Sequence, residues 1–146
     1  MKSVADILKS KPDQTVYNIA PGDSVYDALR LMADRNIGAL LVVEEGKIVG
    51  ILTERDYARK VILMDRSSKQ TAVGEIMTSS VMYVRPDQTN EECMALMTDN
   101  RLRHLPVIDN GRLLGLVSIG DLVKDIISEQ QFIIEQLQQY IQGQRA

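Results

Sequence analysis

A repeat with a spacing of 65 residues constrains this chain more than any other feature of its sequence. Without gaps, residues 21–61 match residues 86–126. Identical pairs include Pro21/Pro86, Met32/Met97, Leu40/Leu105, Gly50/Gly115 and Asp56/Asp121. Self-similarity at a fixed period indicates copies of one supersecondary unit. We therefore predict two tandem units, over residues 1–66 and 67–127, and a helical C-terminal extension over residues 128–146.

Both copies show the same order of secondary-structure signals. An extended stretch (residues 15–19 and 80–84) precedes an amphipathic helix (residues 24–35 and 89–100). Two strands follow, joined by "EEGK" in the first copy and by "DNGR" in the second, and Asn-Gly is a strong type I′ hairpin signal. The sequence thus predicts an α/β fold of two βαββα units. Since one such unit buries little apolar surface alone, we expect the two to pack around a pseudo-twofold axis.

Composition excludes several classes of function. The 146 residues carry a net charge of −3, which gives no general attraction to nucleic acid or to an anionic membrane. The apolar runs are far too short to span a bilayer. The single cysteine, Cys93, aligns with Ala28 on an apolar helix face, so we expect a buried core residue in a reduced, cytoplasmic protein. No cluster of histidine, cysteine or carboxylate residues has the spacing of metal ligands, so no metal site is expected. No nucleophile or second histidine is available to complete a catalytic constellation with His104, so no enzyme is expected.

The turns Thr53-x-x-Asp56 and Ser118-x-x-Asp121 both connect a strand end to a helix start. This spacing is that of a capping box, although aspartate is a shorter reciprocal partner than glutamate. The same spacing occurs at Ser24-x-x-Asp27 and Thr89-x-x-Glu92, where only capping is expected. The strand-end position adds a second interpretation, because a helix N-terminus attracts anions and a neighbouring carboxylate can accept ribose hydroxyls. Capping and nucleotide binding are compatible, and both remain open.

Taken together, the features resemble a tandem pair of CBS domains (cystathionine-β-synthase domains). The resemblance rests on "PGDSVYDALRLMADRNIGALLVVEEGKIVGILTERD" and "PDQTNEECMALMTDNRLRHLPVIDNGRLLGLVSIGD", with the preceding "DILKSK" and "EIMTSS". In that family the two units form an intramolecular pair with two clefts, and pairs commonly associate into a disc-shaped dimer. The clefts bind adenosyl ligands such as AMP, ADP, ATP, S-adenosylmethionine or NAD(H). The resemblance therefore implies a regulatory module that is a homodimer or acts on a partner protein in trans.

The resemblance also implies a set of nucleotide-binding residues in each copy. Asp56 and Asp121 would hold ribose hydroxyls, and the hydroxyls of Thr53 and Ser118 would contact ribose or phosphate. In the first copy the implied site comprises Val16, Tyr17, Ile37, Gly38, Ala39, Thr53, Arg55 and Asp56. In the second copy it comprises Met82, Tyr83, Leu102, Ser118, Gly120 and Asp121.

The two copies differ most where the second strand begins. The first reads "NIGALLVV" and the second "RLRHLPVI", which places Arg101, Arg103 and His104 within four residues. A guanidinium fork suits phosphate oxygens, so these three residues are predicted to contact phosphate. The alternatives are a solvated basic rim, arginines paired with Asp99 and Asp109, and a structural histidine. Since Arg55 precedes Asp56 where the second copy has Gly120, we expect two unequal sites, with the Thr53–Asp56 site better formed.

The C-terminal extension carries an apolar stripe at helical spacing, through Ile127, Ile134, Leu137 and Ile141, with Gln130 in one slot. This helix either covers the core of its own unit, mediates dimerisation or docks a partner protein. The function predicted from the sequence is binding of an adenine nucleotide and signalling of its level. The alternatives are a structural dimerisation module with vestigial clefts and a binder of S-adenosylmethionine.

Overall fold

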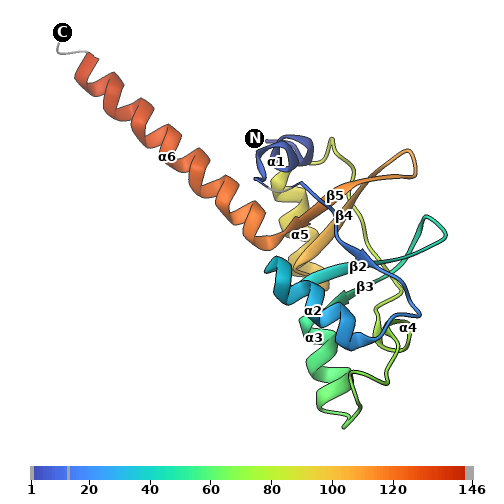
Figure 1. Cartoon of the computed structure of the whole chain (residues 1–146). Coiled ribbons are helices and arrows are strands. Elements are labelled where there is room, and N and C mark those ends of the chain that lie inside the picture. Colours follow the sequence, from blue (N-terminus) through green and yellow to red (C-terminus); the bar gives the residue numbers. More distant parts are fainter. Residues whose placement is uncertain (1, 13, 144–146) are drawn as a thin grey trace. The chain divides into compact units, whose positions relative to one another are not determined.

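The computed structural model describes residues 2–12 and 14–143, and the chain divides into two compact units (Figure 1). The central unit is Thr15–Met82, and the split unit combines Met1–Gln14 with Tyr83–Ala146. These compact units do not coincide with the predicted boundaries at residues 66 and 127, because residues 2–12 and 14 fold with the second repeat. Met1, Asp13 and residues 144–146, which the predicted units include, lie outside the described residues.

The central unit has the predicted βαββα order. Its elements are β1 (Asn18–Ile19), α2 (Val25–Arg35), β2 (Ala39–Glu44), β3 (Lys47–Thr53), α3 (Glu54–Tyr57), the π-helical turn η1 (Ala58–Ile62) and α4 (Val73–Ile76). Strand β1 is parallel to β2, and β2 is antiparallel to β3. The apolar face predicted for α2 packs on this sheet through Val25, Ala28 and Met32, all of which are buried.

The split unit repeats this arrangement around its own core. Its elements are α1 (Val4–Ser10), α5 (Asn90–Asn100), β4 (His104–Asp109), β5 (Arg112–Ser118) and α6 (Ile119–Gly143). Strands β4 and β5 are antiparallel, and Val84 adds a single parallel bridge to Val107. Cys93 is fully buried in this core, where burial and then the charge of Glu92 raise the pKa of its thiol to about 11. The predicted α/β class and the core position of Cys93 are both confirmed.

Both hairpins turn through two residues with positive φ. The values are 51° at Glu45 and 78° at Gly46, and 50° at Asn110 and 77° at Gly111. Two successive residues of positive φ are the signature of the type I′ turn, so the prediction from Asn-Gly holds, and the first copy forms the same turn with glutamate.

Each hairpin carries a helix from the other repeat, and a glycine permits the close approach. In the split unit, a Cβ at Gly115 on β5 would lie 2.8 Å from the Leu8 side chain of α1. In the central unit, a Cβ at Gly50 on β3 would lie 2.6 Å from Met77 Sδ and 3.0 Å from the Thr78 carbonyl oxygen. The residues after α4 also extend the sheet, because Ile51 and Thr78 exchange two backbone hydrogen bonds of 2.9 Å.

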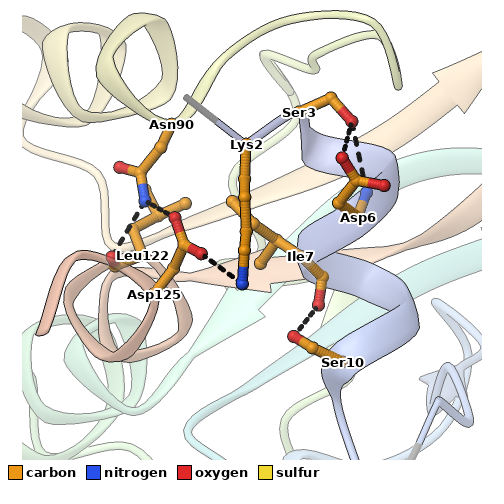
Figure 2. A network of polar contacts seen from close by, with 8 residues as sticks. All are labelled: Lys2, Ser3, Asp6, Ile7, Ser10, Asn90, Leu122 and Asp125. Atoms are coloured by element: carbon orange, nitrogen blue, oxygen red, sulfur yellow. Dashed lines mark hydrogen bonds and ion pairs between the residues drawn. The ribbon is translucent and has the colours of Figure 1, made fainter. Parts of the chain in front are cut away.

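A polar network fixes the N-terminal segment and the first turns of α6 within the split unit (Figure 2). The buried Asn90 side chain donates from Nδ2 to the Leu122 carbonyl and to Asp125 Oδ2, both at 2.9 Å. Lys2 Nζ lies 3.4 Å from Asp125 Oδ1. In the 65-residue register, Asn90 and Asp125 correspond to Val25 and Lys60, so the central unit lacks this network.

Candidate functional site

The Thr53–Asp56 turn joins β3 to α3 in the central unit. Asp56 donates its backbone N–H to Thr53 Oγ1 at 3.1 Å, and Asp56 Oδ2 accepts from the Thr53 backbone N–H at 3.1 Å and from its hydroxyl at 3.2 Å. The other carboxylate oxygen, Oδ1, accepts from the Thr78 hydroxyl at 3.3 Å and lies 3.3 Å from Lys60 Nζ. Both oxygens of this largely buried carboxylate therefore have partners inside the unit.

The Ser118–Asp121 turn joins β5 to α6 in the split unit. Here too the cap is reciprocal, since Asp121 donates its N–H to Ser118 Oγ at 3.1 Å and Asp121 Oδ2 accepts from the Ser118 N–H at 2.9 Å. Lys11 Nζ lies 3.0 Å from the same Oδ2. No donor among residues 2–12 and 14–143 is bonded to Oδ1, and the side chain of Asp121 is 20% exposed compared with 12% for Asp56. Asp121 thus has more free hydrogen-bonding capacity than Asp56.

The two comparison turns form the caps expected of them. Thr89 and Glu92 make a complete capping box, whereas Ser24 accepts from the Asp27 N–H without a reciprocal bond. Spacing alone therefore predicts a helix cap, as the sequence indicated. Although aspartate is shorter than glutamate, a carboxylate oxygen of Asp56 and of Asp121 accepts from the backbone N–H of its capping residue.

Two lysines that were missed from the sequence neutralise the two aspartates. Lys60 pairs with Asp56 and donates to the Ile76 carbonyl at 3.0 Å, while Lys11 pairs with Asp121 and donates to the Leu116 carbonyl at 2.9 Å. The sequence could have indicated the pair of Lys60 with Asp56, because oppositely charged side chains four residues apart on a helix are neighbours. Lys11 follows α1 in the other repeat, so nothing in the local sequence around Asp121 could reveal it.

The segment where each hairpin begins lies beside the capped turn. Ala39 pairs with Thr53 and His104 with Ser118, while the Gly38 and Arg103 carbonyls accept from the backbone N–H groups that follow the caps, at 3.1 and 2.9 Å. Gly120, in the first turn of α6, is exposed. The structure thus brings the hairpin entries and the turns together within each unit.

Several side chains expected to enclose a base have other contacts. Tyr17 packs against the core of the central unit with the Arg35 guanidinium 5.2 Å from its ring centre, and Ile37 packs against the same core. Leu102 packs against the core of the split unit. Val16 is half-buried, whereas Met82 and Tyr83 are exposed at the boundary of the central and split units along the chain.

The predicted phosphate-contacting residues are mostly exposed. Arg55, Arg101 and Arg103 lie on the surface, and Arg101 ends α5 in the left-handed conformation with φ of 55°. His104 is half-buried at the start of β4. Burial lowers the pKa of His104; the Asp121 carboxylate opposes this, and the charges of Lys11 and Arg103 lower the pKa further. The imidazole is therefore neutral at neutral pH, in a surrounding of Lys11, Arg103 and the Asp121 carboxylate.

Other kinds of site are not found in the described part of the chain. Among residues 2–12 and 14–143, no group of three or more histidine, cysteine or carboxylate side chains is placed to hold a metal ion. Within the same residues, no helix combines the length and the apolar character that crossing a membrane requires.

Two βαββα repeats, each with a capped aspartate turn at the end of its hairpin, define the class of protein. The family model of the CBS domain matches residues 4–63 and 73–128, and the chain belongs to this family. It is therefore a pair of CBS domains, a regulatory ligand-binding module, as the resemblance implied.

Similar proteins cover most of the chain. The mitochondrial CBS domain-containing protein CBSX3 of Arabidopsis thaliana is 44% identical over 97% of this chain and 72% of its own length. A solved signal-transduction protein with CBS domains from Burkholderia ambifaria is 61% identical, with a TM-score of 0.86 over 88% of this chain and 96% of that one. The CBS domain pair of protein MJ0100, solved with 5′-methylthioadenosine and S-adenosyl-L-methionine, is 29% identical, with a TM-score of 0.74 over 88% of this chain and 98% of its own.

Proposed function

We propose that this chain binds an adenine nucleotide (AMP, ADP, ATP or NAD(H)) and signals its occupancy to a partner protein or through its own homodimer. The observation that carries the proposal is the Asp121 carboxylate. It lies at a helix start, its Oδ2 is held by the cap and by Lys11, and its Oδ1 accepts no hydrogen bond from residues 2–12 and 14–143. The vicinal hydroxyls of a ribose require an acceptor of this kind.

The charges near Asp121 favour a ligand that carries phosphate. Lys11 lies 3.0 Å from Asp121, and both Lys11 and Arg103 act on the neighbouring His104 with positive charge. A phosphate group would gain charge-assisted hydrogen bonds from these side chains, whereas a sulfonium would be repelled by them. The adenosyl ligands of the MJ0100 pair lack phosphate, so S-adenosylmethionine is the alternative ligand.

An exchange of partners at Lys11 supplies a mechanism for signalling. A nucleotide that draws the Lys11 ammonium to its phosphate would leave Asp121 to accept the ribose hydroxyls. Lys11 is the C-cap of α1, and its N–H donates to the Leu8 carbonyl at 3.2 Å. Ligand binding would therefore alter how α1 is held on β5. A ligand shifts a conformational equilibrium only through such a difference in contacts between two states.

The central unit supports the competing role, that of a structural module without a ligand. Both oxygens of Asp56 already have partners, and a ribose would have to displace the Thr78 hydroxyl or Lys60. We therefore propose that the Ser118–Asp121 site fills first, which reverses the order expected from the sequence.

Isothermal titration calorimetry with AMP, ADP, ATP, NAD+, NADH, S-adenosylmethionine and adenosine tests the proposal. We expect binding of at least one nucleotide, tighter than that of adenosine because of the phosphate contacts, and recovery of the nucleotide unchanged after incubation, as befits a binding module rather than an enzyme. If none of these ligands binds at millimolar concentration, the structural role is correct. Tighter binding of S-adenosylmethionine than of every nucleotide would contradict the charge argument.

A further inference from the structure

The second half of α6 is exposed, and none of the described residues of its unit covers it. The helix starts in the core of the split unit, where Leu122 and Asp125 are buried, and then extends past α1 and α5 (Figure 1). From Ile127 onward its large apolar side chains are between 49% and 64% exposed: Ile127, Phe132, Ile133, Ile134, Leu137, Tyr140 and Ile141. So large an apolar surface on a single helix marks an interaction site.

The apolar residues of this helix follow a seven-residue repeat. If Ile127, Ile134 and Ile141 occupy position a, then Val123, Gln130 and Leu137 occupy position d. Ile133 and Tyr140 occupy the flanking position g and widen the stripe. The seam from Val123 to Ile141 is about 27 Å long at 1.5 Å per residue. Isoleucine occupies all three a positions and leucine one of the three d positions, and β-branched residues at a with leucine at d are the combination that favours a parallel two-stranded coiled coil.

The polar residues identify the partner as a second copy of the same helix. The two acidic residues of this stretch, Glu129 and Glu135, fall at positions c and b, outside the seam. Position e carries Lys124, Gln131 and Gln138, and position g carries the uncharged Ile126, Ile133 and Tyr140, so two identical parallel helices would meet without like charges between e and g. The seam contains one polar residue, Gln130. In a parallel, in-register pair the two Gln130 side chains face each other and can form a hydrogen bond, and a single polar residue at a core position can specify register.

We propose that two copies of this chain associate through α6 as a parallel, in-register two-stranded coiled coil. Its seam is formed by Val123, Ile127, Gln130, Ile134, Leu137 and Ile141. The contact uses no residue of the nucleotide site, so association and nucleotide binding are measured separately, and either can fail without the other.

Sedimentation equilibrium of the full chain tests this association. The substitution Ile134→Glu places a charge at the middle a position and is expected to weaken association by roughly tenfold or more in Kd. The matched control is Phe132→Glu, which introduces the same charge at an equally exposed apolar residue on the opposite face, at position f, and is expected to leave Kd unchanged. A monomeric wild-type chain, or equal association of both variants and the wild type, would overturn the proposal.

Disulfide cross-linking tests the orientation. The variants Ile127→Cys and Ile141→Cys should each form a disulfide-linked homodimer on mild oxidation, because a parallel seam places each residue opposite itself. The wild-type chain is the control, since its buried Cys93 with a raised pKa should not react. In an antiparallel pair centred on Ile134, the two variants would cross-link with each other when mixed but not alone, and that result would refute the parallel arrangement.

Discussion

Replacing Asp56 with alanine tests whether the capped turn of the central unit is structural. The substitution removes the acceptor of the Thr53 backbone N–H, a part-buried group whose bond goes to a charged oxygen. Leaving such a donor unsatisfied costs about 1–2 kcal/mol. The bonds from Lys60 and the Thr78 hydroxyl add roughly 1 kcal/mol, because the lysine side chain is 45% exposed and its ion pair is weakened by solvent. We therefore expect the free energy of unfolding to fall by about 2–3 kcal/mol.

Urea unfolding followed by far-UV circular dichroism measures this loss, read as a lower midpoint at an unchanged m-value. The matched control is Asp27→Ala, since the Asp27 side chain receives no hydrogen bond from the described residues and contributes only through the helix dipole, about 0.5 kcal/mol. Asp56→Asn should recover part of the loss, because its amide oxygen can still accept from Thr53. Equal stability of Asp56→Ala and Asp27→Ala would refute the structural interpretation of the turn.

Three further predictions concern other features of the fold. A Cβ at Gly50 would meet a backbone carbonyl oxygen at 3.0 Å, whereas a Cβ at Gly115 would meet only the movable end of the Leu8 side chain. In urea unfolding, Gly50→Ala should therefore lower the free energy of unfolding by about 2 kcal/mol, clearly more than Gly115→Ala does. Equal losses would contradict this difference in packing. Because the pKa of His104 is lowered in the folded state, the unfolded chain gains a proton first as pH falls, and stability is lost below about pH 6.5. His104→Gln should reduce this loss in unfolding curves taken on either side of that pH, and an unchanged pH dependence would count against it. Arg101 adopts a left-handed conformation that asparagine adopts more readily, as Asn36 does in the central unit. Arg101→Asn should therefore raise the midpoint of thermal unfolding by about 1–3 °C. A lower midpoint would show that the arginine side chain stabilises the fold.

The sequence predicted the local structure well because the determining signals are local. Helical periodicity located α2 and α5, and the Asn110-Gly111 pair located the second hairpin turn. The repeat then extended each assignment to its copy, so the "EEGK" turn, which has a weaker signal, was also placed correctly. Helix capping at Thr53 and Ser118 followed from spacing alone.

Contacts between segments of different repeats could not be predicted from the local sequence. Nothing near β5 indicates that α1, about a hundred residues earlier, packs on it, so the membership of residues 1–14 and the pairing of Lys11 with Asp121 were missed. The identical Gly50 and Gly115 indicated only the repeat, and their role in packing was not predicted. Their lack of a side chain allows α1 and the residues after α4 to approach the strands closely. The Asn90–Asp125 network was missed because the first repeat has Val25 and Lys60 in its place.

The most direct test of the central claim is calorimetric titration of the tightest-binding nucleotide into Asp121→Asn, with Glu92→Gln as the matched control. Both substitutions neutralise the reciprocal carboxylate of a capping box in the split unit, but only Asp121 is proposed to hold a ribose. We predict that Asp121→Asn weakens binding by roughly tenfold or more, the equivalent of at least one strong hydrogen bond, while Glu92→Gln binds as the wild type does. Unchanged affinity of a folded Asp121→Asn variant would show that this carboxylate only caps α6.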